Sequence, residues 1–427
     1  MTYALNIPFI KADNMPEAVA QLSVANFRPG AYIIIENKKD HNYFFIIRKG
    51  NVQVKKSVAT LTNEGAKTLG PGDFFGVIGA MTNQARIETA IGVSDVSLIA
   101  VAKSQFGFLI QKNSPLALKI IRSFSHELRY LNKELTNRSA KSTDENEEGP
   151  ALLFNNAEYY YKQGDQTTAA YLYTRYLQYC PNGDKVTEAK AKIQNLKNAG
   201  ATPPQPQTEM NRTYQDGQMI FSEHEPGDEL FIIQSGKVKI TKIINGKEIL
   251  IAVLNPGDIV GEMALLENKP RTASIVAYGN TNLLAVNKEN FDKIVIQNTN
   301  MATKLITLLS QRIWTIYKQL SNLLLKNPAS RLMDTLLTQI LKQNIQISKK
   351  RPYKFNFGGD ELLKMVGLEG SEGKQALNEM LNKKFLQIQN NKIYCEDIAE
   401  LQKEVTIAYN MQQREMKLAA SKRSRSF

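Results

Sequence analysis

The chain has 427 residues, 42% of them hydrophobic, which argues against a disordered protein and predicts two to four globular domains. No apolar run reaches the roughly 18 residues that span a bilayer, the N-terminus lacks the segments of a signal peptide, and two distant cysteines indicate no disulfide or metal framework, so we expect a cytoplasmic protein. The formal net charge of +13 favours an anionic partner such as nucleic acid, phosphate ligands or a membrane surface.

One domain occurs twice in the chain. Three pairs of segments match: FFIIRKGNVQV (44–54) with LFIIQSGKVKI (230–240), LGPGDFFG (69–76) with LNPGDIVG (254–261), and AVAKSQF (100–106) with AVNKENF (285–291). From Gly72 onward the offset stays at 185 residues, which chance rarely produces. Short β-branched runs separated by Pro-Gly and Asn-Gly turns predict a small antiparallel barrel or jelly roll in each copy.

A long amphipathic helix is predicted after each barrel. The apolar stripe of the first helix is Ala117, Ile121, Phe124, Leu128, Leu131 and Leu135, and that of the second is Ile306, Leu309, Ile313, Ile316, Leu320 and Leu323. Stripes at this spacing suit helix pairing. Three alternatives follow: each helix packs on its own barrel, the two pair within one chain, or a stripe is the seam of a homodimer.

The segment between the copies begins with a polar linker (137–150) and ends with a Pro-rich one (199–211). Between them, residues 151–198 resemble a single tetratricopeptide unit, with a third helix expected from Lys185 to Lys197. The positions that carry the resemblance are Ala157, Tyr160, Gly164, Ala169, Tyr173 and Pro181, with Tyr176 where a small residue is usual. One repeat cannot bury its face alone, so it packs on a neighbouring domain or binds a protein partner.

The second copy contains the segment GDIVGEMALLENKPRTASIVA (257–277). Residues 217–326 resemble a cyclic nucleotide-binding domain of Crp/Fnr-type transcription regulators and of cyclic nucleotide-gated kinases and channels. The residues that match the phosphate-binding cassette of this family are Gly261, Glu262, Ala264, Leu265, Pro270, Arg271, Thr272 and Ala273. The chemistry agrees with the resemblance. Arg271 can neutralise a cyclic phosphate, Glu262 can accept a hydrogen bond from the ribose 2′-hydroxyl, and backbone N–H groups near Met263 to Leu265 add dipolar stabilisation. A structural Glu–Arg ion pair is the alternative.

The resemblance further implies that the following helix meets the base through Thr315, Ile316 and Tyr317, and that Arg312 contacts Glu262. Ile316 and Tyr317 depart from the small hydroxyl residues of well-known bacterial members. Thr272 occurs in cGMP-selective relatives and in cAMP binders, so cAMP or cGMP is the expected effector, with cAMP favoured, and no metal is expected. The predicted ligand-binding residues are therefore Gly261, Glu262, Met263, Ala264, Arg271, Thr272, Ala273, Arg312, Thr315 and Tyr317.

The first copy departs from this pattern. It aligns as Gly76, Val77, Ile78, Gly79, Ala80 and then Arg86, Ile87 and Glu88. Val77 replaces the ribose acid, and Glu88 brings a negative charge to the place of the phosphate, where like charges repel. We expect no ordinary cyclic mononucleotide here, and the first barrel has either a structural or dimerising role or a different ligand.

The sequence of the C-terminal part predicts a strand, helices 359–366 and 371–384, and a hairpin at Asn390-Asn391. It resembles the winged helix-turn-helix of Crp/Fnr-type proteins. The positions that hold base-reading arginines in that family fall at Gly370, Ser371 and Gln375. The remaining candidate DNA contacts are Ser371, Lys374, Gln375 and Asn378, with Lys383 and Lys384 near the phosphates. Protein contacts are the alternative for this domain. The tail KLAASKRSRSF (417–427) reads as disordered, either binding phosphates or solubilising the chain.

The predicted fold class is α+β and multidomain: two antiparallel β-barrel or jelly-roll domains with long C-terminal helices, a tetratricopeptide-like insert and a winged helix. The predicted boundaries are 1–136, 137–150, 151–198, 199–211, 212–326, 327–405 and 406–427. We expect a cyclic nucleotide-responsive transcription regulator that binds DNA as a homodimer through the long helix, without membrane contact. A signalling adaptor whose insert and winged domain bind proteins is the alternative. An enzyme is not expected, because His41, His126 and His224 lie beside no nucleophile.

Overall fold

The computed structural model describes residues 22–59, 65–139, 149–201, 203, 207–244, 246–345, 347 and 350–423. These residues fall into two compact units, each described here by itself. The first unit comprises residues 1–112, 130–141 and 306–427, and the second comprises residues 113–129 and 142–305. Residues 140–148 of the predicted polar linker, residues 202 and 204–206 of the Pro-rich linker, and the last four residues of the chain lie outside the described residues.

Eight short strands form two four-stranded antiparallel sheets in the first unit, with orders β1-β8-β3-β6 and β2-β7-β4-β5. Their bounds are β1 Ser23–Phe27, β2 Tyr32–Ile34, β3 Tyr43–Lys49, β4 Val52–Lys55, β5 Lys67–Leu69, β6 Phe74–Phe75, β7 Thr89–Gly92 and β8 Val96–Ala102. Alternating apolar residues of both sheets share one core, where Phe45 stacks on Phe75 with ring centroids 5.3 Å apart. The antiparallel sheets predicted for the first copy are confirmed, and the jelly-roll connection stays a prediction.

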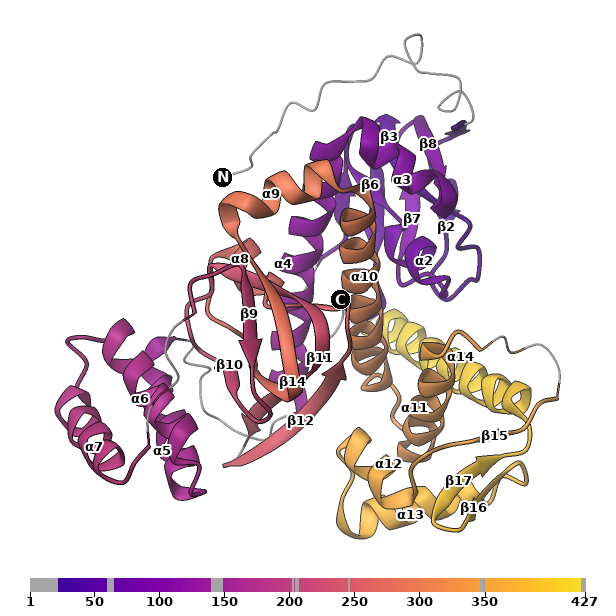
Figure 1. Ribbon diagram of the computed structural model, residues 1–427. Helices are drawn as coiled ribbons and strands as arrows, with labels where there is room; N and C mark the ends of the chain where they lie inside the picture. The colour runs from indigo at the N-terminus through magenta and orange to yellow at the C-terminus, as the bar shows by residue number, and fades with distance from the viewer. Residues whose placement is uncertain are drawn as a thin grey trace. The chain divides into compact units, whose positions relative to one another are not determined.

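The second barrel lies in the second unit and is built on two long strands (Figure 1). The sheet order is β10-β14-β11-β12, with β9 paired to β14 and β13 paired to β11. The bounds are β9 Asn211–Tyr214, β10 Met219–Phe221, β11 Glu229–Ile244, β12 Lys247–Leu254, β13 Ile259–Val260 and β14 Ser274–Asn287. Register shifts between Ile233 and Lys237 interrupt the β11–β14 ladder, and such irregularities bend long strands. In this core Phe221 stacks on Phe231.

Helices follow equivalent strands in the two copies. The first copy has α2 Val77–Thr82, α3 Lys103–Lys112 and α4 Ser114–Ser139, and the second has α8 Glu262–Glu267, α9 Lys288–Gln297 and α10 Thr299–Asn322. The two long helices, α4 and α10, confirm the amphipathic predictions. Every residue of the two stripes is buried within the single chain except Leu135 and Leu323. A homodimer through either stripe would therefore have to displace what already covers it.

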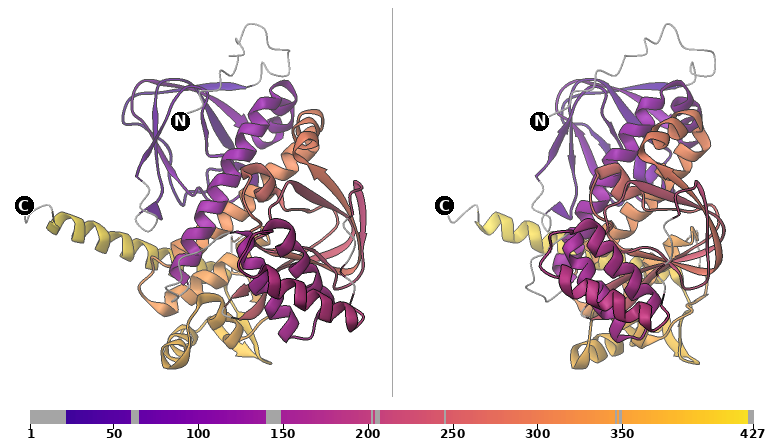
Figure 2. Two further views of the ribbon diagram at one scale, coloured as in Figure 1. Left: turned by 90° about the vertical axis from the view of Figure 1, so that its left-hand side faces the viewer. Right: turned by 60° about the vertical axis from the view of Figure 1, so that its left-hand side comes forward.

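The helical insert packs against the second barrel inside the second unit (Figures 1 and 2). It begins with a 3₁₀ turn, η2 Pro150–Leu152, and continues as α5 Leu153–Lys162, α6 Gln166–Tyr179 and α7 Val186–Asn198. Asp165 caps α6 by accepting a hydrogen bond from the Thr168 N–H. The apolar core of the insert includes Met219 of β10, and Ile243 and Val276 of the barrel pack against this core. The predicted three helices are present, and the predicted packing on a neighbouring domain is confirmed, while the likeness to a tetratricopeptide repeat stays a resemblance.

The C-terminal part of the first unit has one core shared by four helices and a three-stranded sheet of order β15-β17-β16. Its elements are α11 Pro328–Lys342, β15 Tyr353–Lys354, α12 Gly359–Val366, α13 Gly370–Leu381, β16 Leu386–Gln389, β17 Lys392–Cys395 and α14 Ile398–Arg423. Asn390 and Asn391 both have positive φ, as expected for the tight hairpin turn. The elements occur in the predicted order, and their interpretation as a winged helix-turn-helix stays a prediction.

Two expectations for this part were wrong. Helix α13 ends at Leu381 and not at residue 384, so Lys383 and Lys384 lie in the turn that follows. Residues 417–423 are not disordered, because they continue helix α14. Tyr409 of the same helix packs against the core of this part. Among the described residues no helix is long and apolar enough to cross a membrane.

Candidate functional site

The predicted phosphate cassette is a tight turn that leads into the short helix α8. Gly261 precedes this helix with φ of 79°, a left-handed conformation that glycine adopts without strain. A Cβ atom on Gly261 would lie 2.5 Å from Nη1 of Arg271, so a side chain there would displace the arginine. Glu262, Met263 and Ala264 are buried, and Thr272 and Ala273 are partly buried. The local chain therefore brings the backbone of the turn against the guanidinium.

Arg271 is a buried arginine with few partners. Its Nη1 donates to the carbonyl oxygen of Gly261 over 2.8 Å, and its guanidinium lies 4.1 Å from the ring centroid of Phe221. Its Nε atom has no hydrogen-bond partner among the described residues. Burial lowers the pKa of Arg271, although the nearby carboxylates, Glu225 first among them, oppose that shift. A buried cation whose donors are not all used is costly unless an anion completes the site.

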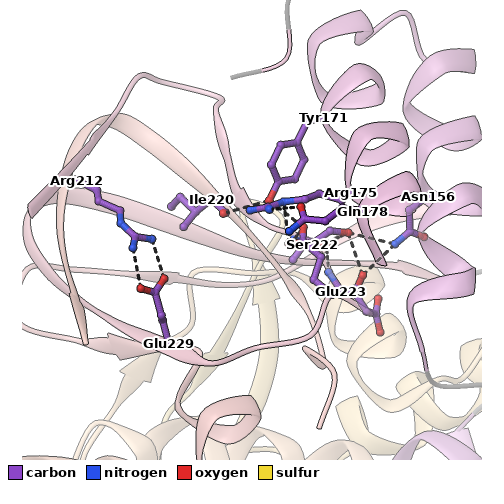
Figure 3. A network of polar contacts seen from close by, with 11 residues as sticks. Asn156, Tyr171, Arg175, Gln178, Arg212, Ile220, Ser222, Glu223 and Glu229 are labelled. Atoms are coloured by element: carbon purple, nitrogen blue, oxygen red, sulfur yellow. Dashed lines mark hydrogen bonds and ion pairs between the residues drawn. The ribbon is translucent and has the colours of Figure 1, made fainter. Parts of the chain in front are cut away.

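A cavity of about 240 Å³ borders Arg271 within the second unit. Helix α6 of the insert and the barrel strands both line it. Its aromatic residues are Tyr171, Tyr179, Tyr214, Phe221 and Phe231, and its charged residues besides Arg271 are Arg175, Arg212, Glu225, Asp228 and Glu229. Arg212 and Glu229 satisfy each other through two hydrogen bonds of 2.7 and 2.8 Å (Figure 3). Sequence reasoning missed the contribution of the insert, since only folding brings α6 to this place.

The half of helix α4 that belongs to the second unit reaches the cassette from the first copy. Nε of Arg129 forms an ion pair of 2.7 Å with Glu267, the last residue of α8, and both side chains are buried. Ser125 of the same helix donates to Glu267 over 3.0 Å. Arg129 also contacts the carbonyl oxygens of Met263 and Pro270 at 3.4 Å. Helix α4 of the first copy therefore packs on the cassette of the second copy within one chain, an arrangement that was not among the alternatives drawn from the sequence.

The three predicted residues of helix α10 lie in a different unit from the cassette. Arg312 and Thr315 are partly buried, and Tyr317 is fully buried. The Tyr317 hydroxyl hydrogen-bonds to the Glu36 carboxylate and lies 3.1 Å from the Ser57 hydroxyl, both in the first barrel. The hydroxyl of Tyr317 is thus engaged by protein, and the base contact predicted for this helix stays a prediction.

The equivalent arginine of the first barrel is fully engaged by protein. Nη1 of Arg86 donates to the Gly76 carbonyl over 2.7 Å, as Arg271 does to Gly261. Unlike Arg271, Arg86 also donates from Nε to the Asp40 carboxylate over 2.8 Å, and from Nη2 to the carbonyls of Asp40 and Tyr43. The Glu88 carboxylate accepts a hydrogen bond from the Gly76 N–H at 2.7 Å. The carboxylate of Asp40 and the carbonyls of Asp40 and Tyr43 thus take the place that an anion would need.

The candidate nucleic-acid interface is one exposed face of α13. Ser371, Lys374, Gln375 and Asn378 are all exposed and recur at helical spacing, while Gly373, Ala376 and Met380 of the opposite face are buried. Lys384 is exposed. Nζ of Lys383, however, forms an ion pair of 2.6 Å with Glu404 of α14, so its charge is already partly neutralised. Among the described residues no group of three or more His, Cys, Asp or Glu side chains could hold a metal ion.

Comparison with known proteins finds a family match for two segments of the chain and several relatives. The cyclic nucleotide-binding domain family matches residues 24–113 and 211–298. A CRP-like cAMP-activated global transcriptional regulator of Mycobacterium tuberculosis is 23% identical over 186 residues, which are 43% of this chain and 83% of that protein. The cyclic AMP receptor protein of Thermus thermophilus is 33% identical over 135 residues, 31% of this chain and 62% of that protein.

Among solved structures, the Thermus thermophilus catabolite activator protein is 25% identical, and the match covers 46% of this chain and 90% of that one at a TM-score of 0.27. The two segments found by the family match are the two copies recognised from the repeat in the sequence. Two segments of the chain therefore match the cyclic nucleotide-binding domain family, and CRP-like transcriptional regulators are among the relatives to which parts of the chain are similar.

Proposed function

We propose that the protein is a cyclic nucleotide-responsive DNA-binding transcription regulator whose effector binds in the second barrel, with cAMP favoured over cGMP. The observation that carries the proposal is the state of Arg271, a buried guanidinium whose Nε has no hydrogen-bond partner among the described residues. A cyclic phosphodiester supplies the missing anion through charge-assisted hydrogen bonds. Glu262 is the acceptor for the ribose 2′-hydroxyl, and the backbone after Gly261 approaches the phosphate.

The first barrel has a structural role in this proposal. Arg86 and the Gly76 N–H are both satisfied internally, so an entering anion would have to break an ion pair and several hydrogen bonds. Those bonds include charged groups, and each costs on the order of 1.5–3 kcal/mol to lose. One effector molecule per chain follows from this difference.

Helix α10 is the proposed relay within the first unit. Its neighbouring residues Tyr317 and Lys318 contact different partners: Tyr317 bonds to Glu36 of the first barrel, and Lys318 lies 3.3 Å from the buried Asp334 carboxylate of α11. Asn322 and Tyr409 each donate to the same carboxylate over 3.0 Å. A shift of α10 on effector binding would therefore be transmitted to α11 and to the C-terminal domain that contains α13.

DNA reading is assigned to the exposed face of α13, with Lys374, Gln375 and Asn378 as base or phosphate contacts. A chain carries one such face, so a palindromic site requires two chains. Because both helix stripes are buried within the single chain, we assign the homodimer interface to another surface. The alternative, an adaptor in which this domain and the insert bind proteins, is favoured by the ion pair that engages Lys383.

A gel shift separates the two functions. The full chain is titrated onto a pool of random duplexes at 50 and 200 mM salt, with and without cAMP. The transcription-regulator hypothesis predicts DNA binding that falls steeply with salt and is enhanced by cAMP. Lys374→Ala should reduce the slope of log affinity against log salt concentration by about one unit. Lys190→Ala, an exposed lysine of the insert, is the matched control and should change nothing. An absence of binding, or a slope unaffected by Lys374→Ala, would favour the adaptor.

A further inference from the structure

The insert contributes a charged side chain, that of Arg175, to the surroundings of Arg271. One buried acid, Glu225, interacts with both arginines. Glu225 lies in the turn between β10 and β11 and is 2% exposed. One carboxylate oxygen accepts hydrogen bonds from the Ser222 N–H and the Tyr171 hydroxyl, each over 2.9 Å. The other lies 3.4 Å from Nε of Arg175. Tyr171 and Arg175 belong to α6, so the insert provides half of the environment of this acid.

Arg175 is held in place by its own helix. Its guanidinium lies 5.2 Å from the ring centroid of Tyr171 and 5.9 Å from that of Tyr179, and its Nη1 donates to Gln178 over 2.9 Å. Burial disfavours its charge, but attraction to Tyr171 and Glu225 outweighs burial and raises the pKa of Arg175. The guanidinium is therefore a fixed cation on the insert side of Glu225.

Arg271 is the second cation that this carboxylate attracts. Burial raises the pKa of Glu225, and both Arg175 and Arg271 oppose that effect. Yet among the described residues Glu225 forms an ion pair with Arg175 and none with Arg271. A buried carboxylate deprived of its partner takes the nearest other cation or becomes protonated. Arg271 lines the same cavity as Glu225, and its backbone N–H donates to the Glu225 carbonyl over 2.7 Å. Without Arg175, the other cation that attracts Glu225 is therefore the guanidinium on which the proposed effector site depends.

We propose that Arg175 is a positioning residue of the effector site: by engaging Glu225, it leaves the Arg271 guanidinium available to an anionic ligand, so that ligand affinity depends on docking of the insert. This inference rests on the proposed function of the second barrel. The coupling is reciprocal, because a phosphate bound to Arg271 withdraws that cation from Glu225 and strengthens the hold of Glu225 on Arg175. The insert is then a regulatory domain, and a partner that displaced it would weaken effector binding.

The insert has other attachments to the barrel, so the role of Arg175 can be separated from docking. Its apolar core includes Met219 of β10. Tyr160 donates to Glu248 of β12 over 2.6 Å, and the Asn156 amide donates to Ser222 and the Glu223 carbonyl over 3.3 and 3.4 Å. Loss of the Arg175 charge leaves all of these contacts in place.

The test is a double-mutant cycle read by calorimetric titration of the full chain with cAMP and with cGMP. Arg175→Gln should weaken binding at least tenfold, whereas Glu225→Gln alone should change it less than threefold. The double variant Arg175→Gln/Glu225→Gln should return to within threefold of the wild type, because the competing carboxylate is gone. A purely structural Arg175 would leave the double variant as weak as the single one, and that result would overturn the inference. Unchanged affinity in Arg175→Gln would overturn it too.

A control variant and a second measurement complete the design. Tyr160→Phe removes a hydrogen bond between insert and barrel without touching Glu225 and should leave affinity unchanged; a loss as large as that of Arg175→Gln would contradict the inference. A crystal structure of the ligand-free Arg175→Gln variant should show Glu225 within 4 Å of the Arg271 guanidinium. An unmoved carboxylate rejects the inference even if the wild type bound neither nucleotide, a result that would reject the proposed function.

Discussion

Nε of Arg86 donates a 2.8 Å hydrogen bond to the carboxylate of Asp40, whereas Nε of the equivalent Arg271 has no hydrogen-bond partner among the described residues. The two guanidinium groups share one contact, because each donates from Nη1 to the carbonyl of the glycine that precedes a short helix. Arg86 alone also donates from Nη2, to the carbonyls of Asp40 and Tyr43. The duplication has thus produced one arginine that the protein satisfies and one that it leaves available to a ligand.

Truncation of the two arginines should destabilise the protein by different amounts. Arg86→Ala removes four hydrogen bonds from a buried group and should destabilise the chain by about 3 kcal/mol. Arg271→Ala should lower the free energy of unfolding by less than about 1 kcal/mol, because the buried charge of Arg271 has few partners to lose. Differential scanning calorimetry of the two variants without ligand checks this. Equal losses of stability would show that Arg271 is a structural arginine like its twin.

Glu262 should govern recognition of the sugar. Glu262→Gln keeps the size of the side chain but weakens the acceptor, so affinity for cAMP should fall by ten- to a hundredfold. For 2′-deoxy-cAMP, which lacks the hydroxyl, the wild type and the variant should bind with the same affinity. Competition with a fluorescent cyclic nucleotide measures both ligands. An equal loss for the two ligands would assign Glu262 to the structural ion pair instead.

His224 makes the stability of the second barrel dependent on pH. Burial, followed by the charge of Lys242, lowers its pKa to about 4 from an ordinary value of 6.5, while the carboxylate of Glu223 lies 4.0 Å from its ring. Between these values the unfolded chain binds more protons, so stability is complete above pH 6.5 and falls towards pH 4, by at most about 3 kcal/mol.

The first copy shows which residue can replace His224 in a test of this pH dependence. Asn37 has φ of 67° and donates its N–H to the Arg86 carbonyl, as His224 with φ of 74° donates to the Arg271 carbonyl. His224→Asn should therefore fold normally and flatten the loss of stability between pH 7 and pH 4.5 in urea titrations. A wild type whose stability is independent of pH in this range would contradict the assignment.

Asp334 should couple effector binding to DNA binding by the C-terminal domain that contains α13. Asp334→Asn lowers the charge that holds Lys318 and keeps a side chain that can still meet Asn322 and Tyr409. We expect cAMP affinity within threefold of the wild type, but at least a fivefold smaller effect of cAMP on DNA affinity in the gel shift. A full response in this variant would remove Asp334 from the relay.

The cassette could be found from the sequence because its residues lie within one short segment and its degenerate twin provides an internal comparison. Glu225, Arg175 and Asp40 could not be found, since their roles depend on partners that only the tertiary fold brings together. The stripes of α4 and α10 were recognisable by their spacing, but spacing does not reveal what covers a stripe. The length of α14 was missed because its last turns are polar, and the residues that anchor it, the buried Val405 and the partly buried Tyr409, precede them.

Calorimetric titration of the wild type and Arg271→Ala with cAMP, cGMP and a cyclic dinucleotide tests the central claim most directly. The account predicts that a cyclic mononucleotide, with cAMP favoured, binds the wild type with a stoichiometry of one per chain and does not bind Arg271→Ala. Binding of none of the three ligands to the wild type, or equal binding to the variant, would contradict it.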